Sequence, residues 1–201
     1  MGLIVGLTGS MGSGKTTAAG LFKELGARII DADAICRELV LPHQPAWEDI
    51  VRGFGKTILK EDHTIDRAKL AGIVFNDKNQ KGLLENILHP KVIEEEMRLC
   101  AQIFESDPQS IIVIDAALLI ESGNYEKVDK VIVVTCDRES LIRRAMERSS
   151  LTREEAGLRI QSQMPQEEKV KKADYVLPND GTRENLQTGV EKIYTELKLS
   201  T

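Results

Sequence analysis

The sequence has few cysteines, few aromatic residues and no long apolar run. Its three cysteines, Cys36, Cys100 and Cys136, are far apart and form no CxxC pair. This spacing argues against a disulfide framework or a cysteine-based zinc site and predicts buried free thiols instead. No apolar stretch reaches the length of about 18 residues that a membrane-spanning helix needs.

The chain also lacks an excess of positive charge. The 201 residues hold 27 Lys and Arg against 32 Asp and Glu, for a net charge of −5, and only 4% are aromatic. The mildly negative balance argues against bulk, charge-driven nucleic-acid binding, and the aromatic residues are too few for a base-stacking platform. Residues 1–6 carry no basic stretch and do not resemble a signal peptide. We expect a cytoplasmic protein with no nucleic-acid, membrane or obligate protein partner.

Short apolar runs alternate with helical patterns along the chain. The runs lie at residues 3–7, 27–33, 111–115, 130–135 and, more weakly, 174–177. Continuous runs of this length are typical of strands buried on both faces, and their alternation with helices is typical of a parallel sheet. The sequence therefore predicts an α/β fold with a five-stranded parallel sheet and helices on both faces.

Two long insertions interrupt this alternation. About 80 residues separate the second and third strands, and their spacing predicts helices near 34–41, 47–54, 67–75, 81–88 and 90–104. The last of these is expected to begin at Pro90, because proline suits the first position of a helix. After the fourth strand, Asp137 is expected to cap one helix and Thr152 to open a capping box before the next. A closing helix is expected over residues 182–199.

A glycine-rich turn follows the first strand. Residues 9–16 read GSMGSGKT and match the phosphate-loop pattern GxxxxGK[ST] in full. Glycines let backbone N–H groups approach phosphate oxygens, Lys15 brings a cation to the β- and γ-phosphates, and Thr16 can hold Mg²⁺. The pattern arises by chance in about 1% of chains this long, and here it stands between a strand and a helix, as its mechanism requires. We predict a three-layer P-loop NTPase fold that binds ATP and Mg²⁺, with the nucleotide held by Gly9, Ser10, Met11, Gly12, Ser13, Gly14, Lys15, Thr16 and Thr17.

With this loop in place, the chain divides into three functional parts. Residues 1–32, 107–136 and 173–201 are expected to form the nucleotide-binding core. Residues 33–106 are expected to form a helical substrate-binding insert, and residues 137–172 a helical lid.

Three acidic residues stand at predicted strand ends, where open α/β sheets bind their ligands. Asp115 ends an Ile-Ile-Val-Ile run and, together with Thr16, is our candidate for supporting Mg²⁺. Asp33 is our candidate for accepting the proton of an attacking hydroxyl. Asp31 is a further candidate. The alternative for each of the three is a helix cap or a turn.

Six arginines fall between residues 138 and 159. Arg144 and Arg148 are four residues apart and share one helix face, so we expect them to reach the transferred phosphoryl group when the lid closes. The alternative is a solvated helix with ion pairs such as Glu139–Arg143, which we expect for about half of the arginines. His89 precedes Pro90, and two interpretations stay open: a structural turn or a ligand for a substrate phosphate.

Two classes of phosphate-loop protein fit these features, a small-molecule kinase and a GTP-dependent switch. A switch protein needs a DxxG element after its third strand and an NKxD element that reads guanine. Asp115 is followed by Ala-Ala-Leu without a glycine, and the nearest match to NKxD is Glu-Lys-Val-Asp at residues 126–129, which lacks the asparagine. A helical insertion plus an arginine-rich lid is instead the layout of nucleotide and metabolite kinases.

The ordered motifs resemble those of the dephospho-coenzyme A kinases, which catalyse the last step of coenzyme A synthesis. The matching pieces span nearly the whole chain and include GLTG at 6–9, DAD at 31–33, IDR at 65–67, HP at 89–90, LLIESG at 118–123, EK at 168–169 and ADYV at 173–176. The resemblance implies ATP-dependent phosphorylation of the ribose 3′-hydroxyl of dephospho-CoA. Another nucleotide or metabolite kinase of this fold is the alternative.

The resemblance also implies roles for individual residues. Asp33 would be the general base, Arg144 would contact the ATP phosphates, and Lys15 would complete the catalytic set. The helical insert would hold the pantetheine-bearing substrate. The substrate-binding set that it implies is Thr8, Asp31, Asp33, Arg67, His89 and Leu118.

Overall fold

The computed structural model describes residues 2–200 of the chain, which divides into two compact units. The first, called the sheet unit below, comprises Met1–Asp31 and Cys100–Thr201, and the second, called the insert unit, comprises Ala32–Leu99. The boundary between Leu99 and Cys100 lies inside helix α5 (Lys78–Ser106), so this helix belongs in part to each unit. None of the helices among residues 2–200 combines the length and the apolar character needed to cross a membrane.

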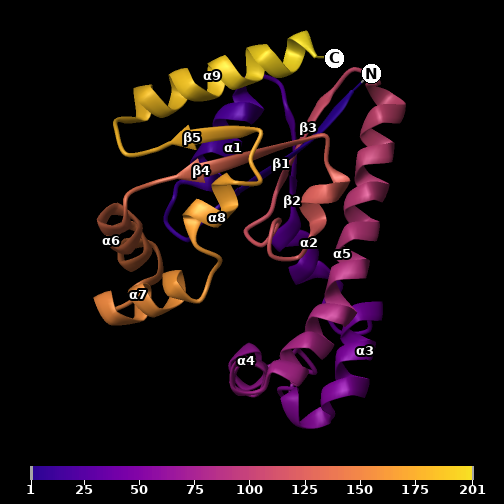
Figure 1. The fold of residues 1–201 in the computed structure, drawn as a ribbon. Coiled ribbons are helices and arrows are strands. Elements are labelled where there is room, and N and C mark those ends of the chain that lie inside the picture. The colour runs from indigo at the N-terminus through magenta and orange to yellow at the C-terminus, as the bar shows by residue number, and fades with distance from the viewer. Residues whose placement is uncertain (1, 201) are drawn as a thin grey trace. The chain divides into compact units, whose positions relative to one another are not determined.

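The sheet unit contains a parallel sheet of five strands in the order β2-β3-β1-β4-β5 (Figure 1). This confirms the predicted fold class. Strands β2 and β3 lie on one side of β1, and the later strands β4 and β5 lie on the other side. The strand order therefore reverses at β1, and the loop that follows β1 lies at the position where such sheets usually bind their ligands. The strands are β1 (Leu3–Gly9), β2 (Arg28–Asp31), β3 (Ile111–Asp115), β4 (Lys130–Thr135) and β5 (Tyr175–Pro178).

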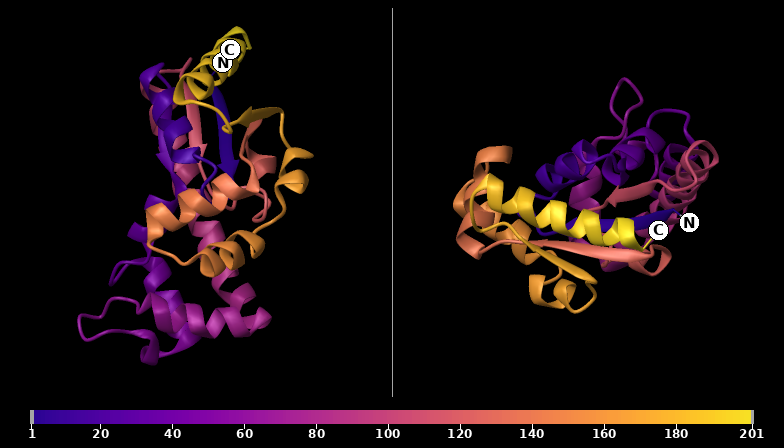
Figure 2. Two further views of the ribbon diagram at one scale, coloured as in Figure 1. Left: turned by 90° about the vertical axis from the view of Figure 1, so that its left-hand side faces the viewer. Right: turned by 90° about the horizontal axis from the view of Figure 1, so that it is seen from above.

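Helices α1 (Lys15–Glu24) and α9 (Arg183–Leu199) cover one face of this sheet, and α9 packs against α1 and β5 (Figure 2). Alternate strand residues such as Val5 and Leu7 join the apolar core on that side. The chain that follows β3 covers the other face of the sheet. Its Leu119 side chain packs so closely on Gly6 of β1 that a Cβ atom at Gly6 would lie only 2.4 Å from it. That chain includes the short helix η2 (Asn124–Lys127).

The segment between β4 and β5 forms three helices: α6 (Arg138–Ser149), α7 (Arg153–Gln161) and α8 (Gln166–Val170). The side chain of Asp137 accepts the N–H of Ser140 at 2.9 Å, and Thr152 forms the capping box, so both predicted caps are confirmed. Helix α8 has no counterpart in the sequence analysis. Its five residues are too few for a helical period to show.

The insert unit is helical around a small apolar core of its own. Its buried residues are Ile50, Ile58, Ile65 and Leu70. Ahead of α5 come α2 (Ala32–Leu39), α3 (Pro45–Phe54), the short η1 (Lys56–Ile58) and α4 (Arg67–Asn76).

The predicted second strand, residues 27–33, extends too far. Strand β2 ends at Asp31, which pairs in register with Asp115, the last residue of β3. Beyond that pair the neighbouring strand has ended, so further residues would have no partner. Ala32 and Asp33 begin α2 instead, and an acidic side chain in the first turn of a helix interacts favourably with the helix dipole.

The predicted helix start at Pro90 is wrong. The two helices expected at 81–88 and 90–104 are one continuous helix, α5, with Pro90 inside it. Proline removes one helical hydrogen bond and costs about 3 kcal/mol. The residues before it, Ile87 and Leu88, pack on the insert core, and a single intervening residue is too short for the chain to leave one helix and nucleate another.

Candidate active site

The phosphate loop joins β1 to α1, and its shape depends on glycine. Gly12 and Gly14 have φ angles of 83° and 93°, a region that residues with a Cβ atom rarely adopt. A Cβ at Gly12 would lie 2.4 Å from the Leu141 carbonyl oxygen, and one at Gly14 would lie 2.0 Å from Nδ2 of Asn179. Gly14 is the N-cap of α1 and has no side chain to bond the first-turn N–H groups. Those N–H groups are suited to bind phosphate.

Lys15, Asp115 and Asp31 gather at the carboxyl edge of the sheet, as their positions in the sequence predict. The ammonium group of Lys15 is paired with the Asp115 carboxylate. Asp31 stands beside Asp115 on the neighbouring strand. Only 14% of the Lys15 side chain and 10% of the Asp115 side chain are exposed, so little solvent screens the pair. The pair places one cation and one carboxylate beside the glycine-rich turn.

The other residues predicted around the loop differ in accessibility. Thr16 and Thr17 are exposed in the first turn of α1, which leaves the Thr16 hydroxyl open to a metal ion. Thr8 is fully buried, and its hydroxyl donates to the Ala117 carbonyl at 3.3 Å. That hydroxyl is therefore used within the protein. Leu118, on the chain that follows β3, is 49% exposed.

Arg144 is held beside the phosphate loop by Asn179 and Cys136, neither of which was predicted to lie at the site. Its guanidinium donates to the Asn179 carbonyl at 3.1 Å and meets the Cys136 sulfur at 3.3 Å. The Asn179 amide in turn donates to the Ser13 carbonyl at 2.7 Å. Asn179 immediately follows β5. The sequence gives one indication that Asn179 belongs to the site: it is a polar residue directly after a strand, at the edge of the sheet where ligands bind.

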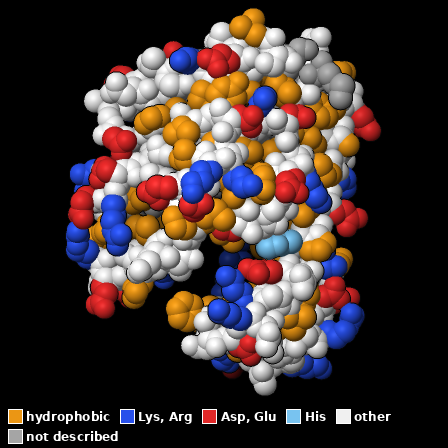
Figure 3. All heavy atoms as spheres, in the orientation of Figure 1, with side chains coloured by type: hydrophobic (Ala, Val, Ile, Leu, Met, Phe, Trp, Pro, Cys, Tyr) orange, Lys and Arg blue, Asp and Glu red, His pale blue; other side chains and the backbone are white. Residues whose placement is uncertain are grey.

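The remaining lid arginines are more exposed. Arg148 lies one turn beyond Arg144 on α6 and is exposed. Figure 3 shows basic and acidic side chains side by side over α6 and α7. Glu139 pairs there with Arg153 at 2.7 Å, rather than with the expected Arg143.

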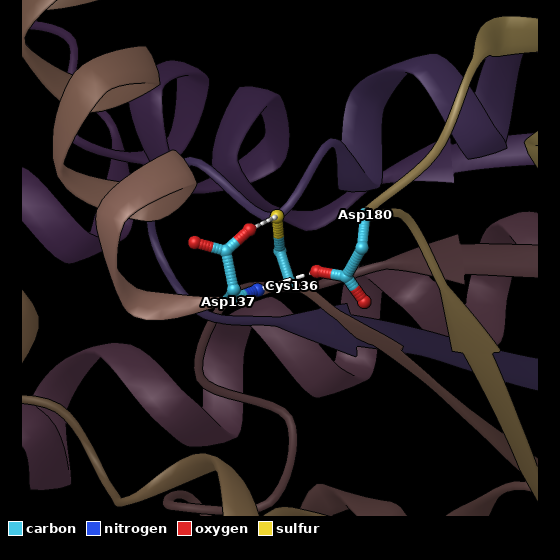
Figure 4. A group of neighbouring side chains, drawn as sticks. All are labelled: Cys136, Asp137 and Asp180. Atoms are coloured by element: carbon cyan, nitrogen blue, oxygen red, sulfur yellow. Dashed lines mark hydrogen bonds between the residues drawn. The ribbon is translucent and has the colours of Figure 1, made fainter.

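Cys136, Asp137 and Asp180 form a tight group at the end of β4 (Figure 4). One ligand atom of each lies within 4.8 Å of the others, which makes them the one potential metal-binding group of its kind among residues 2–200. Each is already engaged. Asp137 caps α6, Asp180 accepts the Asp137 N–H at 2.5 Å, and burial raises the pKa of the Cys136 thiol. A protonated thiol beside the Arg144 cation is a poor metal ligand, so we assign no ion to this group.

The insert unit contains a cavity of about 310 Å³. Asp33, Arg37 and Arg67 line it and are exposed. Burial, followed by the charge of Asp33, raises the pKa of the Cys36 thiol beside them. The rest of the lining is apolar and consists of Val40, Ile50, Ile65, Leu70, Leu84 and Leu88.

The cavity brings together two of the predicted substrate-binding residues, Asp33 and Arg67. His89 is absent from its lining. It lies half-buried within α5, so the alternative of a structural turn at His89 is wrong. Its role as a ligand for phosphate stays a prediction.

Comparison with known proteins decides the family. The dephospho-CoA kinase family model matches residues 3–185. The chain belongs to the dephospho-CoA kinase family. Among its curated relatives, the dephospho-CoA kinase of Bacillus cereus is 42% identical over 193 residues, with 96% of each chain covered. That of Corynebacterium glutamicum is 41% identical over 195 residues, with 97% of each covered.

Solved structures agree with the family in fold. The dephospho-CoA kinase of Campylobacter jejuni superposes with a TM-score of 0.72 at 33% identity, covering 100% of this chain and 99% of that one. A protein of Thermus thermophilus reaches a TM-score of 0.82 at 33% identity, with 98% of each chain covered. A shikimate kinase from Bacteroides thetaiotaomicron, at 16% identity and a TM-score of 0.54 over 98% of each chain, shares the fold alone.

Proposed function

We propose that the protein transfers the γ-phosphoryl group of ATP to the ribose 3′-hydroxyl of dephospho-CoA. The observation that carries this proposal is the family match over residues 3–185 together with an intact phosphate loop whose lysine is paired at the sheet edge. The curated relatives named dephospho-CoA kinase are covered almost end to end, which supports the same activity for the whole chain.

The loop suits a nucleotide triphosphate with Mg²⁺. Its N–H groups and Lys15 supply donors and positive charge for the β- and γ-phosphates, and glycine is required where the turn leaves no room for a Cβ atom. The exposed Thr16 hydroxyl and the Asp115 carboxylate are oxygen ligands of the kind that Mg²⁺ prefers. The bound ion would neutralise charge on the phosphates.

Asp33 is the residue that we propose takes the proton from the 3′-hydroxyl. It lies in the first turn of α2, exposed and beside the insert cavity. An exposed carboxylate can accept a proton from a hydroxyl within hydrogen-bond reach, and its negative charge orients that hydroxyl beforehand. Arg144 and Arg148 are proposed to balance the charge on the phosphates during transfer.

The insert cavity matches the chemistry of this substrate. Dephospho-CoA combines a diphosphate with an adenosine and a long pantetheine chain of low charge. Arg37 and Arg67 are suited to the diphosphate because guanidinium groups bind phosphate oxygens in pairs. The apolar lining is suited to the pantetheine chain. We further propose that this reaction takes place in the cytoplasm, the compartment expected from the sequence.

The proposal is tested by a coupled assay of ADP formation with separate acceptors. Dephospho-CoA, pantothenate and a panel of nucleoside monophosphates are each offered with ATP and Mg²⁺. We expect sustained ADP formation with dephospho-CoA only. ADP formation with a nucleoside monophosphate, and none with dephospho-CoA, would assign a different kinase activity to the chain.

A further inference from the structure

The tip of the phosphate loop is bonded to the lid. The backbone N–H of Met11 donates to Oε1 of Gln163 at 2.8 Å. Gln163 is half-buried in the stretch between α7 and α8. The loop works through the directions of its N–H groups, so a side chain that fixes one of them also restricts the orientation of its neighbours.

A second contact joins the same two segments. The Met11 side chain packs on an apolar cluster of the lid, formed by the buried residues Ile142, Ala145 and Ala156. The loop tip is thus held by one apolar contact and one directed hydrogen bond. Apolar contacts carry little orientation of their own, which leaves the hydrogen bond from Met11 to set the orientation.

Gln163 is itself held in place through a buried ion pair. The N–H of the next residue, Met164, donates to Oε1 of Glu121 at 3.4 Å, and Nζ of Lys169 meets the same oxygen at 2.7 Å. The Lys169 side chain is fully buried, and its ammonium also donates to the Ala117 carbonyl at 3.5 Å. Separating a buried lysine from its acidic partner costs much free energy, because it leaves a buried charge without compensation. The pair therefore fixes residues 163–169 against the chain that follows β3.

We propose that Gln163 is a positioning residue for the phosphate loop, and that the Lys169–Glu121 pair acts through it. The inference rests on the proposed use of ATP. By holding the Met11 N–H, Gln163 keeps the loop close to its binding conformation before nucleotide arrives. The nucleotide then loses less free energy in ordering the loop. Gln163 does not touch the reacting atoms in this role.

The direct test replaces Gln163 with methionine, which has a similar length and no strong acceptor. We expect Gln163→Met to weaken binding of a non-hydrolysable ATP analogue about three- to tenfold, the range of one neutral hydrogen bond. The KM for ATP should rise by the same factor, while the KM for dephospho-CoA stays unchanged and the melting temperature falls by no more than about 5 °C, as expected for the loss of one hydrogen bond. Gln161→Met is the matched control, because Gln161 is exposed two residues earlier and should bind like the wild type.

Calorimetry with the analogue alone separates this inference from the proposed function. If Gln163→Met binds the analogue within twofold of the wild type, Gln163 does not position the loop. An equal rise in the KM values of both substrates would also overturn the proposal, since a general structural defect would produce it. If the wild type binds the analogue but phosphorylates no dephospho-CoA, the proposed function fails while the role of Gln163 is still measured.

A second variant tests the part assigned to the ion pair. Lys169→Met should weaken analogue binding as Gln163→Met does, and the double variant should bind no more weakly than either single one, because both changes act through the Met11 contact. Additive losses in the double variant would show that Lys169 acts by another route.

Discussion

Among single residues, Lys15 connects the phosphate loop to the sheet. Its ammonium group meets Asp115 at the end of β3, and both side chains are mostly buried. The same cation is proposed to meet the β- and γ-phosphates, so it contributes to binding and to charge balance during transfer. Its replacement should therefore affect both steps, unlike the replacement of a residue that acts in only one.

Lys15→Met is expected to raise the KM for ATP and to lower kcat/KM at least about 10²-fold, because a preorganised cation is lost where charge develops. Steady-state kinetics with ATP varied at saturating dephospho-CoA measures both effects. Lys23→Met, in the last turn of the same helix and exposed, is the control and should behave like the wild type. Near-normal activity of Lys15→Met would remove Lys15 from the mechanism.

Asp33→Asn should separate binding from chemistry. Asparagine keeps the size of the side chain but cannot accept the proton, so kcat should fall by about 10²-fold or more while ATP affinity changes little. The measurement combines single-turnover rates with calorimetric binding of an ATP analogue. Glu38→Gln alters an exposed acid on the same helix and should leave both values intact. Wild-type turnover by Asp33→Asn would exclude Asp33 as the base.

Among the elements, the helix caps form as the sequence predicts because they depend on neighbours only a few residues apart. The Thr152 and Asp137 caps bond N–H groups three residues onward. Asp66, for which we made no prediction, caps α4 in the same local way and accepts the N–H groups of Ala68 and Lys69 at 3.1 Å. By contrast, the end of β2 and the passage of α5 through Pro90 depend on strand pairing and on packing against distant residues. No local pattern contains that information.

The Asp66 cap has a predicted pH dependence. The N–H of Lys69 bonds the carboxylate and lowers the pKa of Asp66 in the folded protein. Because the pKa of Asp66 is lower in the folded protein than in the unfolded chain, the cap stabilises the fold at pH values above the unfolded pKa of about 3.9. This stabilisation is lost as the pH falls through the pKa of the folded protein. The difference in melting temperature between wild type and Asp66→Ala should therefore be largest at neutral pH and shrink as the pH falls below the unfolded value of about 3.9. A constant difference would contradict the role of the ionised carboxylate. Glu61→Ala, an exposed change in the preceding loop, is the control.

At the scale of the whole molecule, the five-stranded sheet could be predicted because buried parallel strands leave continuous apolar runs in the sequence, as Ile111–Asp115 does. The phosphate loop could be predicted because its parts are contiguous. The residues that hold the loop and Arg144 in place could not be predicted. Arg144 is held by Asn179, and Met11 by Gln163, and these partners lie 35 and 152 residues apart in the chain. Only the folded sheet unit brings them together.

The division of the chain illustrates the same limit. The helical patterns of the sequence predict a substrate-binding insert over residues 33–106, and contacts within the structure separate residues 32–99 as a compact unit. The boundary after Leu99 falls within α5, whereas the expected boundary coincides with the end of that helix at Ser106. A helix that runs through two units shows no break in its pattern, so the sequence offers no signal for where one core ends and the other begins.

The central claim is the transfer of a phosphoryl group to one hydroxyl of dephospho-CoA, and phosphorus and proton NMR of the product tests it most directly. The purified chain is incubated with ATP, Mg²⁺ and dephospho-CoA until ADP formation stops. We predict one new phosphomonoester signal per ADP formed, coupled to the ribose H3′ proton. ADP with inorganic phosphate alone, or a phosphomonoester coupled to a different proton, would contradict the account.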